Sequence, residues 1–536
     1  AVGTSAGAAL QTGTNNTFVG TSAGQTLGTS GTGADHCTFL GYQAGFDGDT
    51  IIQTTAVGAK ALHEITSGNY NVAVGFECLE ETTIGDYNTA VGTYALKTNV
   101  NGDRSTAVGY GALFAQGPSS AGNADYQNVA VGMHAGYNVS TAKKNVFVGY
   151  EAGNGNGSDK VTGEGNTFVG NEAGHDITSG YHNVLVGHLS GDSMTTGYSN
   201  IGIGYRAMQA NDQGRHNIAI GPQAMDVYQP ASAGSGYNVA LGAFAGLALT
   251  TGAQNTILGG LAGRSITTEN SCTMVGYGAG YYNQTGANCT FIGVETAQGT
   301  ALNVLTGNDN TAVGYRAGFA LQGAATNNTF VGKESGSATT TGTGNTVVGS
   351  TAGNNVTTGD SNILLGYASV FSAADMDAEF VIGAGVTGSG GSTITIGSGA
   401  GKISNNFTSN ATWTQSSDER LKTDIKSDSL GLSFINRLNP VTYKWKPSNE
   451  IDKSLPYYKE TNEKDTSVTM HGLVAQEVKS ALDAESCTTF AGWGEGLDGV
   501  QTISREMFVS PLIKAIQELS AKITALEARV ATLEGE

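Results

Sequence analysis

A short repeat runs through the first 400 residues and restricts the folds open to this chain. Each repeat carries the motif Asn-x-apolar-apolar-Gly, as in residues 16–20. The motif glycines recur 23 times between residues 3 and 397, and of the 22 intervals between them 15 are 17 residues long and four are 21. A fixed period with occasional four-residue insertions is typical of a solenoid whose insertions lie in one loop. The repeat predicts a mainly β fold, a long parallel β-solenoid of about 22 rungs.

The strand predicted in each rung is apolar on both sides. The residue before the motif glycine is Val, Ile or Leu, and the one before that is usually Ala, Phe, Leu or Ile. Because adjacent strand residues face opposite sides, we expect both faces to be buried. A 17-residue rung encloses little volume, so a partner chain would have to cover one face. We therefore expect a slender stack, on the order of 100 Å long at about 4.8 Å per rung, with an oligomeric core.

One slot of the repeat, four residues before the motif glycine, is occupied by Asn in 15 of 22 rungs from 16 to 393. Amides stacked in register can hydrogen-bond along the axis as a ladder. Cys37, Cys272 and Cys289 fall in this slot, and we expect them to be small buried substitutes for Asn. Five cysteines without a CxxC pair predict neither a zinc site nor a disulfide framework.

Tyrosines directly after several motif glycines allow two interpretations. They could form a carbohydrate-binding row, or they could pack along the edges of neighbouring rungs, which is the interpretation that we favour. The tyrosines are Tyr110, Tyr150, Tyr205, Tyr277 and Tyr315.

Composition divides the chain near residue 416 and excludes several classes. Residues 1–416 hold 73 of the 80 glycines and 38 charged residues, whereas residues 417–536 hold 7 glycines and 33 charged residues. The net charges are −14 and −5, which disfavours nucleic-acid binding. No apolar stretch is long enough to span a membrane. We expect no metal and no cofactor, and no carboxylate pair recurs in the rungs as a glycosidase cleft would require.

Three sequence blocks follow the repeats. They are Ser417-Asp418-x-Arg420-x-Lys422, Leu-x-Pro-Val-x-Tyr-x-Trp-Lys at 438–446, and Gly-Leu-Val-Ala-Gln-Glu-Val at 472–478. Together they resemble the endosialidase-type intramolecular chaperone, a self-cleaving serine peptidase domain at the end of phage tail fibres and spikes. The resemblance covers roughly residues 417–536. The repeats more loosely resemble the heads of trimeric adhesins, with a longer rung.

The resemblance implies a catalytic pair of Ser417 as nucleophile and Lys422 as its partner, with cleavage between Ser416 and Ser417. A serine hydroxyl needs a base to take its proton, and a neutral lysine can do this once burial depresses its pKa. The alternative is that Ser417 caps a turn and Lys422 is a solvated surface charge. Residues that could orient the site or hold subunits together are Asp418, Arg420, His471, Gln476 and Glu477.

The last segment predicts a helix with an unbroken heptad seam. The seam consists of Leu512, Ile516, Leu519, Ile523, Leu526, Val530 and Leu533. Ile and Val at one core position with Leu at the other favour a dimer by rule, whereas the resemblance and the two-faced rung imply a trimer, which we expect. The alternative is an amphipathic helix packed on its own domain.

These features together predict a homotrimeric viral fibre or spike located in the virion. Its parts are a shaft (1–401), a linker to the cleavage site (402–416), a small α/β chaperone domain (417–510) and a coiled-coil helix (511–536). Expected partners are a host glycan or protein receptor and, through an N-terminal part preceding this sequence, tail or baseplate proteins. The alternatives are a cellular extracellular adhesin or filament, a polysaccharide depolymerase, and an uncleaved domain that remains as a permanent tip.

Overall fold

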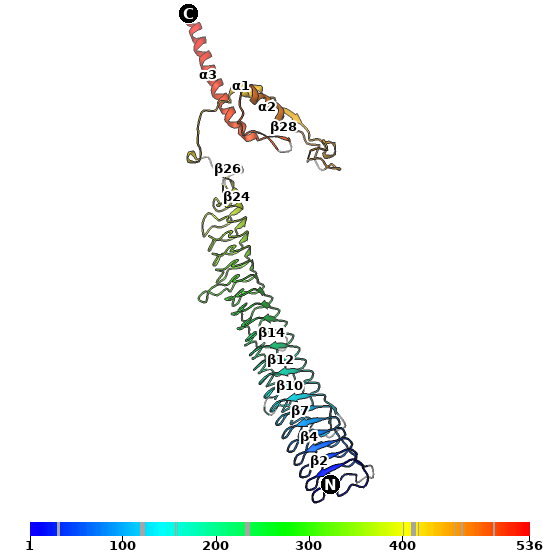
Figure 1. The fold of residues 1–536 in the computed structure, drawn as a ribbon. Helices are drawn as coiled ribbons and strands as arrows, with labels where there is room; N and C mark the ends of the chain where they lie inside the picture. Colours follow the sequence, from blue (N-terminus) through cyan, green and yellow to red (C-terminus); the bar gives the residue numbers. More distant parts are fainter. Residues whose placement is uncertain are drawn as a thin grey trace. The chain divides into compact units, whose positions relative to one another are not determined.

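The computed structural model describes residues 1–535 except 29–32, 118–123, 156, 158, 231–235, 400, 409–413, 416–417, 456, 463–464 and 497–498. The chain divides into two compact units, residues 1–416 and 417–536 (Figure 1).

The first unit is built around one sheet of 24 strands. Twenty-two of them pair in parallel, each with the strand of the next rung, as for β5 and β7, where Thr89 lies opposite Thr106 and Val91 opposite Val108. This regular register confirms the predicted mainly β solenoid of 17-residue rungs (Figure 1).

The parallel strands are β1 (Thr17–Val19), β2 (Thr38–Leu40), β3 (Thr55–Val57), β4 (Val72–Val74), β5 (Thr89–Val91), β7 (Thr106–Val108), β9 (Val129–Val131), β10 (Val146–Val148), β11 (Thr167–Val169), β12 (Val184–Val186), β13 (Ile201–Ile203), β14 (Ile218–Ile220), β15 (Val239–Leu241), β16 (Thr256–Leu258), β17 (Thr273–Val275), β18 (Thr290–Ile292), β19 (Thr311–Val313), β20 (Thr329–Val331), β21 (Thr346–Val348), β22 (Ile363–Leu365), β23 (Phe380–Ala384) and β24 (Thr393–Ser398). A separate two-stranded sheet pairs β6 (Gly102–Asp103) with β8 (Ala124–Asp125).

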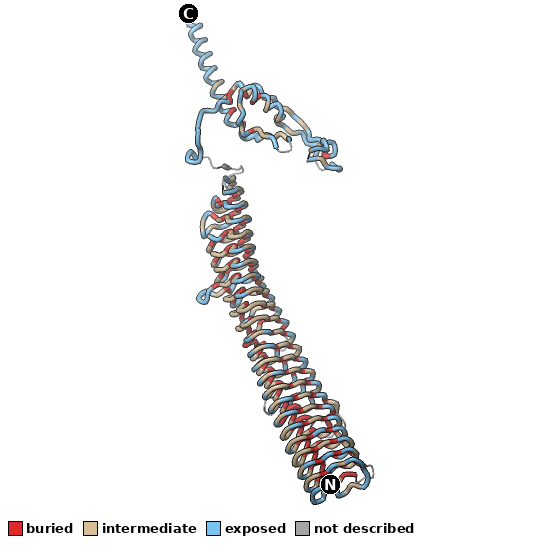
Figure 2. Tube along the Cα trace, viewed as in Figure 1, coloured by how far each residue is buried: buried red, intermediate tan, exposed pale blue. Residues whose placement is uncertain are grey.

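The interior of the solenoid contains the central strand residue of each rung, a small residue after the motif glycine, and further apolar side chains such as Leu62 and Ile65. The central residue of every three-residue strand of the stack is buried, as Ala73 is in β4 and Phe168 in β11. Three residues after the motif glycine, Ala95 and its equivalents are buried beside it. Figure 2 shows these buried positions recurring along the shaft. This small residue therefore packs inside the rung.

The outer side of the strand is not covered within the single chain, so burial of this face by a partner chain stays a prediction. The two residues flanking the central one remain partly or fully exposed in every three-residue strand, as Val129 and Val131 do in β9. A single chain has no second layer on this side of its sheet, so burial of the outer face cannot come from the solenoid itself.

The motif glycines permit the close stacking of rungs. Gly75 has a φ of +141°, and a Cβ atom placed on it would lie 2.5 Å from the carbonyl oxygen of Gly92 in the next rung. Residues with a side chain rarely adopt this conformation, and the backbone oxygen leaves no room for one. The repeat therefore requires glycine at this corner for two separate reasons.

The predicted asparagine ladder is confirmed. The backbone N–H of Asn88 donates to Oδ1 of Asn71 at 2.9 Å, and Nδ2 of Asn88 donates to the carbonyl of Gly102 at 2.7 Å. In many rungs the side-chain amides also bond to one another, as Nδ2 of Asn200 does to Oδ1 of Asn183 at 3.1 Å. These contacts pair buried polar groups that would otherwise be costly.

A second ladder, which sequence reasoning missed, runs two residues before the first. The N–H of Asn69 donates to Oδ1 of Asp86 at 2.7 Å, and the N–H of Asp86 donates to Oδ1 of Asp103 at 2.8 Å. The signal was the recurrence of Asp and Asn at this slot.

The cysteines in the asparagine slot behave as expected. All five cysteines are free, and Cys37, Cys272 and Cys289 are buried. The thiol of Cys272 lies 3.3 Å from the carbonyl of Gly286 and donates to it in place of the Asn amide. Burial raises the pKa of the Cys37 thiol to about 11, so the protonated donor is the favoured form.

The shaft ends in a change of strand direction. β25 (Gly401–Asn406) pairs antiparallel with β24, and β26 (Thr414–Gln415) pairs antiparallel with β25. Part of the segment that we expected to be a linker, 402–416, is therefore strand. In the rung before the last, Glu379 occupies the asparagine slot, and its carboxylate accepts from the N–H groups of Ser372 and Gly390.

The second unit combines short helices, two antiparallel strand pairs and one long helix. Its elements are η1 (Glu419–Leu421), α1 (Leu432–Arg437), β27 (Val441–Tyr443), η2 (Ser448–Glu450), β28 (Met470–Gly472), α2 (Ala475–Ala484), β29 (Trp493–Glu495), β30 (Gln501–Ile503), η3 (Arg505–Phe508) and α3 (Val509–Glu534). β27 pairs with β28 and β29 with β30, both antiparallel.

The core of this second unit is small. It consists of Leu430, Phe434, Val478, Ala481, Leu482 and Phe508. Several large apolar side chains elsewhere in the unit are exposed, among them Leu421, Ile425 and Trp445. A small domain with few buried side chains is marginal on its own, so further apolar contacts are needed for a robust fold.

Candidate functional site

The segment that precedes Lys422 is held by a local charge pair. Asp418 caps η1, where its Oδ1 accepts the N–H of Arg420 at 2.9 Å. The guanidinium of Arg420 also donates to the carboxylate, with Nη2 2.6 Å from Oδ2. These hydrogen bonds from Arg420 lower the pKa of Asp418 below its ordinary value. The negative charge of Asp418 is therefore paired with the guanidinium of Arg420.

The proposed nucleophile and cleavage bond lie outside the described residues, because neither Ser416 nor Ser417 is among them. Lys422 is exposed at the end of η1, where its backbone N–H donates to the carbonyl of Glu419 at 3.0 Å. A lysine that serves as a base must be neutral, and burial is what favours that form. The Ser417–Lys422 pair therefore stays a prediction, and the single chain leaves Lys422 open to solvent.

The other predicted site residues lie on two neighbouring elements. His471 is exposed in β28 opposite Thr442, and Gln476 and Glu477 are exposed in the first turn of α2. Asn439 donates to Glu477 Oε2 at 3.3 Å. Among the described residues, no hydrogen bond or ion pair joins this group to Asp418 or Arg420. The single chain thus does not bring the two sets together.

The long helix α3 presents two faces with different surroundings. Pro511 and Ala515 are buried, and Glu518 Oε2 accepts the N–H of Leu432 at 2.8 Å at the start of α1. Sequence reasoning missed this role of Glu518, because its spacing from Lys514 suggests only a surface ion pair. One face of the N-terminal half of α3 therefore packs on its own domain.

The heptad seam is the other face, and it is exposed along its full length. The exposed fractions range from 44 % to 71 % over Leu512, Ile516, Leu519, Ile523, Leu526, Val530 and Leu533. Figure 2 shows the distal part of α3 as exposed throughout. The seam side chains therefore do not pack on their own domain as the alternative interpretation required.

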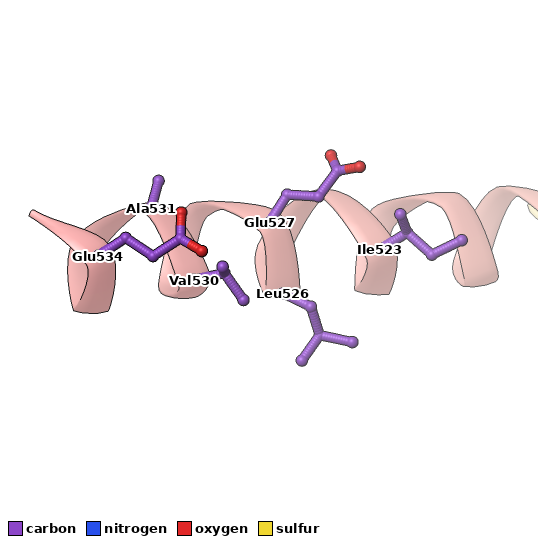
Figure 3. A pocket seen from close by; sticks show the side chains of 6 residues that line it. All are labelled: Ile523, Leu526, Glu527, Val530, Ala531 and Glu534. Atoms are coloured by element: carbon purple, nitrogen blue, oxygen red, sulfur yellow. The ribbon is translucent and has the colours of Figure 1, made fainter.

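The end of the seam borders a shallow surface hollow. It is lined by Ile523, Leu526, Glu527, Val530, Ala531 and Glu534. In Figure 3 Leu526 and Val530 point to one side of the helix, whereas Glu527 and Ala531 point to the other. An apolar stripe flanked by carboxylates is the pattern of a helix that packs against another helix.

The tyrosine row on the shaft is open to solvent. Tyr110, Tyr150, Tyr205, Tyr277 and Tyr315 are between 41 % and 54 % exposed. Packing between rungs of one chain therefore covers only part of each ring, and both interpretations of the row stay open.

Neither a metal site nor a membrane helix is present in the described ranges. No group of three or more His, Cys, Asp or Glu side chains in them is placed to hold a metal ion. None of the helices that the structure describes is long and apolar enough to cross a membrane.

Comparison with known proteins finds a family match for one segment of the chain. Residues 417–486 match the family described as chaperone of endosialidase. No curated protein and no solved structure matches the chain. The matched segment covers η1 to the end of α2 and includes every predicted site residue except Ser416 and the helix seam. Together with the β-solenoid, it fits a tail-spike-like fibre with an intramolecular chaperone domain.

Proposed function

We propose that this chain is a homotrimeric viral fibre whose C-terminal unit aligns three copies and then cleaves itself off. The observation that carries the proposal is the combination, in one chain, of a 17-residue solenoid with a segment that matches the chaperone family. The exposed seam of α3 supports it, because such a seam is stable only against partner helices. A host-surface receptor and attachment through an N-terminal part belong to the same proposal.

A separate chaperone meets a physical need of this shaft. If one chain slips by 17 residues against another, equivalent rungs still pair, and the shifted arrangement is nearly as stable as the correct one. Parallel pairing of segments that are distant in sequence is also slow. A C-terminal trimer would set the register and raise the local concentration of the chains. Removing it afterwards would leave the assembled shaft kinetically trapped.

The cleavage step uses groups of the chain itself. Lys422 takes the proton of the Ser417 hydroxyl, and Oγ attacks the carbonyl carbon of Ser416. The peptide C–N bond breaks as an ester forms, and the amine of Ser417 takes up the proton. Water then hydrolyses the ester, which leaves a carboxylate on Ser416 and frees residues 417–536. Association of three chains would enclose this site and exclude water from it.

Intact mass under denaturing conditions tests the proposal. We expect a species ending at Ser416 and a separate fragment of residues 417–536. Ser417→Ala should give only the full-length chain, with Ser427→Ala as a control that still cleaves. A single full-length mass for the natural chain would mean that the domain stays as a permanent tip. Continued cleavage in Ser417→Ala would remove Ser417 and Lys422 from the catalytic roles.

A further inference from the structure

We infer that parallel copies of this chain pack together, in register, through the outer face of the shaft sheet. This outer face consists of the first and third residues of each three-residue strand in the stack, with their equivalents in β23 and β24. The inference rests on the proposed trimeric fibre and names the surface that its chains share.

The outer face is free of charge over its whole length, and most of its side chains are apolar. Two residues in each of 22 strands make 44 side chains, and all of them are Thr, Val, Ile or Leu except Phe380. None is Lys, Arg, Asp or Glu, although residues 1–416 contain 38 charged residues. Those charges lie elsewhere in the rung, as Lys97 does where it pairs with Glu77 and Glu80. A long strand face without any charge is unusual for a surface that meets only water, and a large, mostly apolar exposed surface marks an interaction site.

The exposure of this face is large enough for a stable assembly. The third residue of many of these strands is 36–45 % exposed, for example Leu40 at 45 %, Val131 at 39 % and Leu365 at 41 %. A standard protein interface uses about 20–30 residues from each partner. The outer face offers 44 in one chain, which exceeds that requirement.

The spacing of the side chains on the outer face indicates which molecule can cover it. Parallel strands present their side chains at intervals of about 4.8 Å, and only a surface with the same repeat can match them over 22 rungs. The longer rungs keep this register, since Val148 lies opposite Val169 across a 21-residue interval. A second copy of the chain, parallel and at the same height, repeats every spacing, including the irregular ones. The exposed seam on α3 independently indicates association with further helices.

Paired substitutions in the same two rungs test this assignment in the full chain. Val348→Glu with Leu365→Glu places carboxylates on the outer face. The matched control, Thr351→Glu with Ala368→Glu, places them three residues later, in the slot where Glu334 lies in the preceding rung. We expect the outer-face variant to lose assembled protein at least about tenfold in sedimentation, because buried unpaired carboxylates disrupt packing. The control should assemble as the natural chain does.

A labelling experiment covers the case in which the outer-face variant does not fold. Cys487 is the one cysteine of the five that is not buried, so Cys487→Ser provides a background without a reactive thiol. Pyrene attached to Val348→Cys should give excimer emission between chains, and pyrene on Thr351→Cys should give none.

The outcomes separate the two proposals. If the natural chain is a trimer and the outer-face variant assembles normally, the assignment of the face is wrong. The same holds if pyrene at position 348 gives no excimer emission. In both cases the proposal of a trimeric fibre still stands. A natural chain that is monomeric after cleavage and at high concentration would overturn both. A complex with another protein in place of self-association would also overturn the assignment.

Discussion

The backbone N–H of Asn200 donates to Oδ1 of Asn183, 3.0 Å away in the preceding rung. Nδ2 of Asn183 in turn donates to the carbonyl of Gly197 at 2.8 Å. One side chain thus satisfies two backbone groups of the next rung, and because both asparagines are buried, water cannot replace either bond. The ladder therefore joins rungs into a single cooperative stack.

Removing one member of the ladder should weaken the shaft. Asn183→Ala leaves the Asn200 N–H and the Gly197 carbonyl unpaired in the core, at about 1–3 kcal/mol each, or roughly 2–6 kcal/mol per chain. Asn183→Cys is the matched control, since a thiol occupies this slot at Cys272 and donates to the equivalent carbonyl. We expect it to lose about half as much. Denaturant unfolding of both variants measures the difference, and equal losses would contradict the role of the side-chain bonds.

A methyl group on a motif glycine should be far more harmful than one on a glycine at the end of the shaft. Gly75→Ala forces a φ of +141° on alanine and a contact with the Gly92 carbonyl, so the free energy of unfolding should fall by at least about 2 kcal/mol. Gly401→Ala meets no atom within 4 Å and should be near neutral. A thermal melt distinguishes them, and indistinguishable midpoints would show that rungs can move apart to accept the methyl.

Alkaline pH should weaken the shaft through its buried thiols. Burial raises the pKa of Cys78 from 9.0 to about 12. Below pH 9 both folded and unfolded chains keep this proton, and above it only the unfolded chain releases it, so stability falls until about pH 12. Cys78→Ala removes the effect and matches the alanines that fill this place in most rungs.

The comparison is made between pH 8 and pH 10.5. Relative to Cys78→Ala, the natural chain should lose about 2 kcal/mol in unfolding free energy over this range. The same loss in both proteins would mean that tyrosines, not this thiol, set the alkaline limit.

Charges in the seam of α3 should prevent assembly, while charges beside it should not. Ile516→Asp with Ile523→Asp alters the exposed seam, and Ser520→Asp with Thr524→Asp adds the same charge at other exposed positions of the helix. We expect the seam variant to yield at least about tenfold less assembled fibre on refolding, since coiled coils require apolar a and d residues. Light scattering of the refolded chains measures the yield. Equal yields of assembled fibre from the two variants would show that α3 is a surface helix and that its seam is not needed for assembly.

Much of the shaft could be predicted from the sequence because it is local and repeated. The 17-residue period determines the register, the motif glycines determine the corners, and the central strand residues determine the interior. The Asn slot predicted the ladder that Asn71 and Asn88 form. Each of these features depends on residues at a fixed separation, and repetition presents the same signal many times.

Less of the second unit could be predicted from the sequence, because each of its sequence patterns occurs only once. The three blocks indicated the family, and the heptad spacing indicated α3. Sequence could not show that Glu518 bonds to Leu432, 86 residues away, or that Asp418 closes on Arg420. It also placed a linker where β25 turns back on β24.

The sequence by itself determined which residues of this protein repeat, which are apolar and where the chain changes character. Only the tertiary structure decided which apolar faces are covered. Val131 and Ala130 are both apolar strand residues, yet Ala130 is buried and Val131 is 39 % exposed, because a solenoid closes around one side of its sheet. Burial depends on which surfaces meet, and the residue type alone does not contain that information.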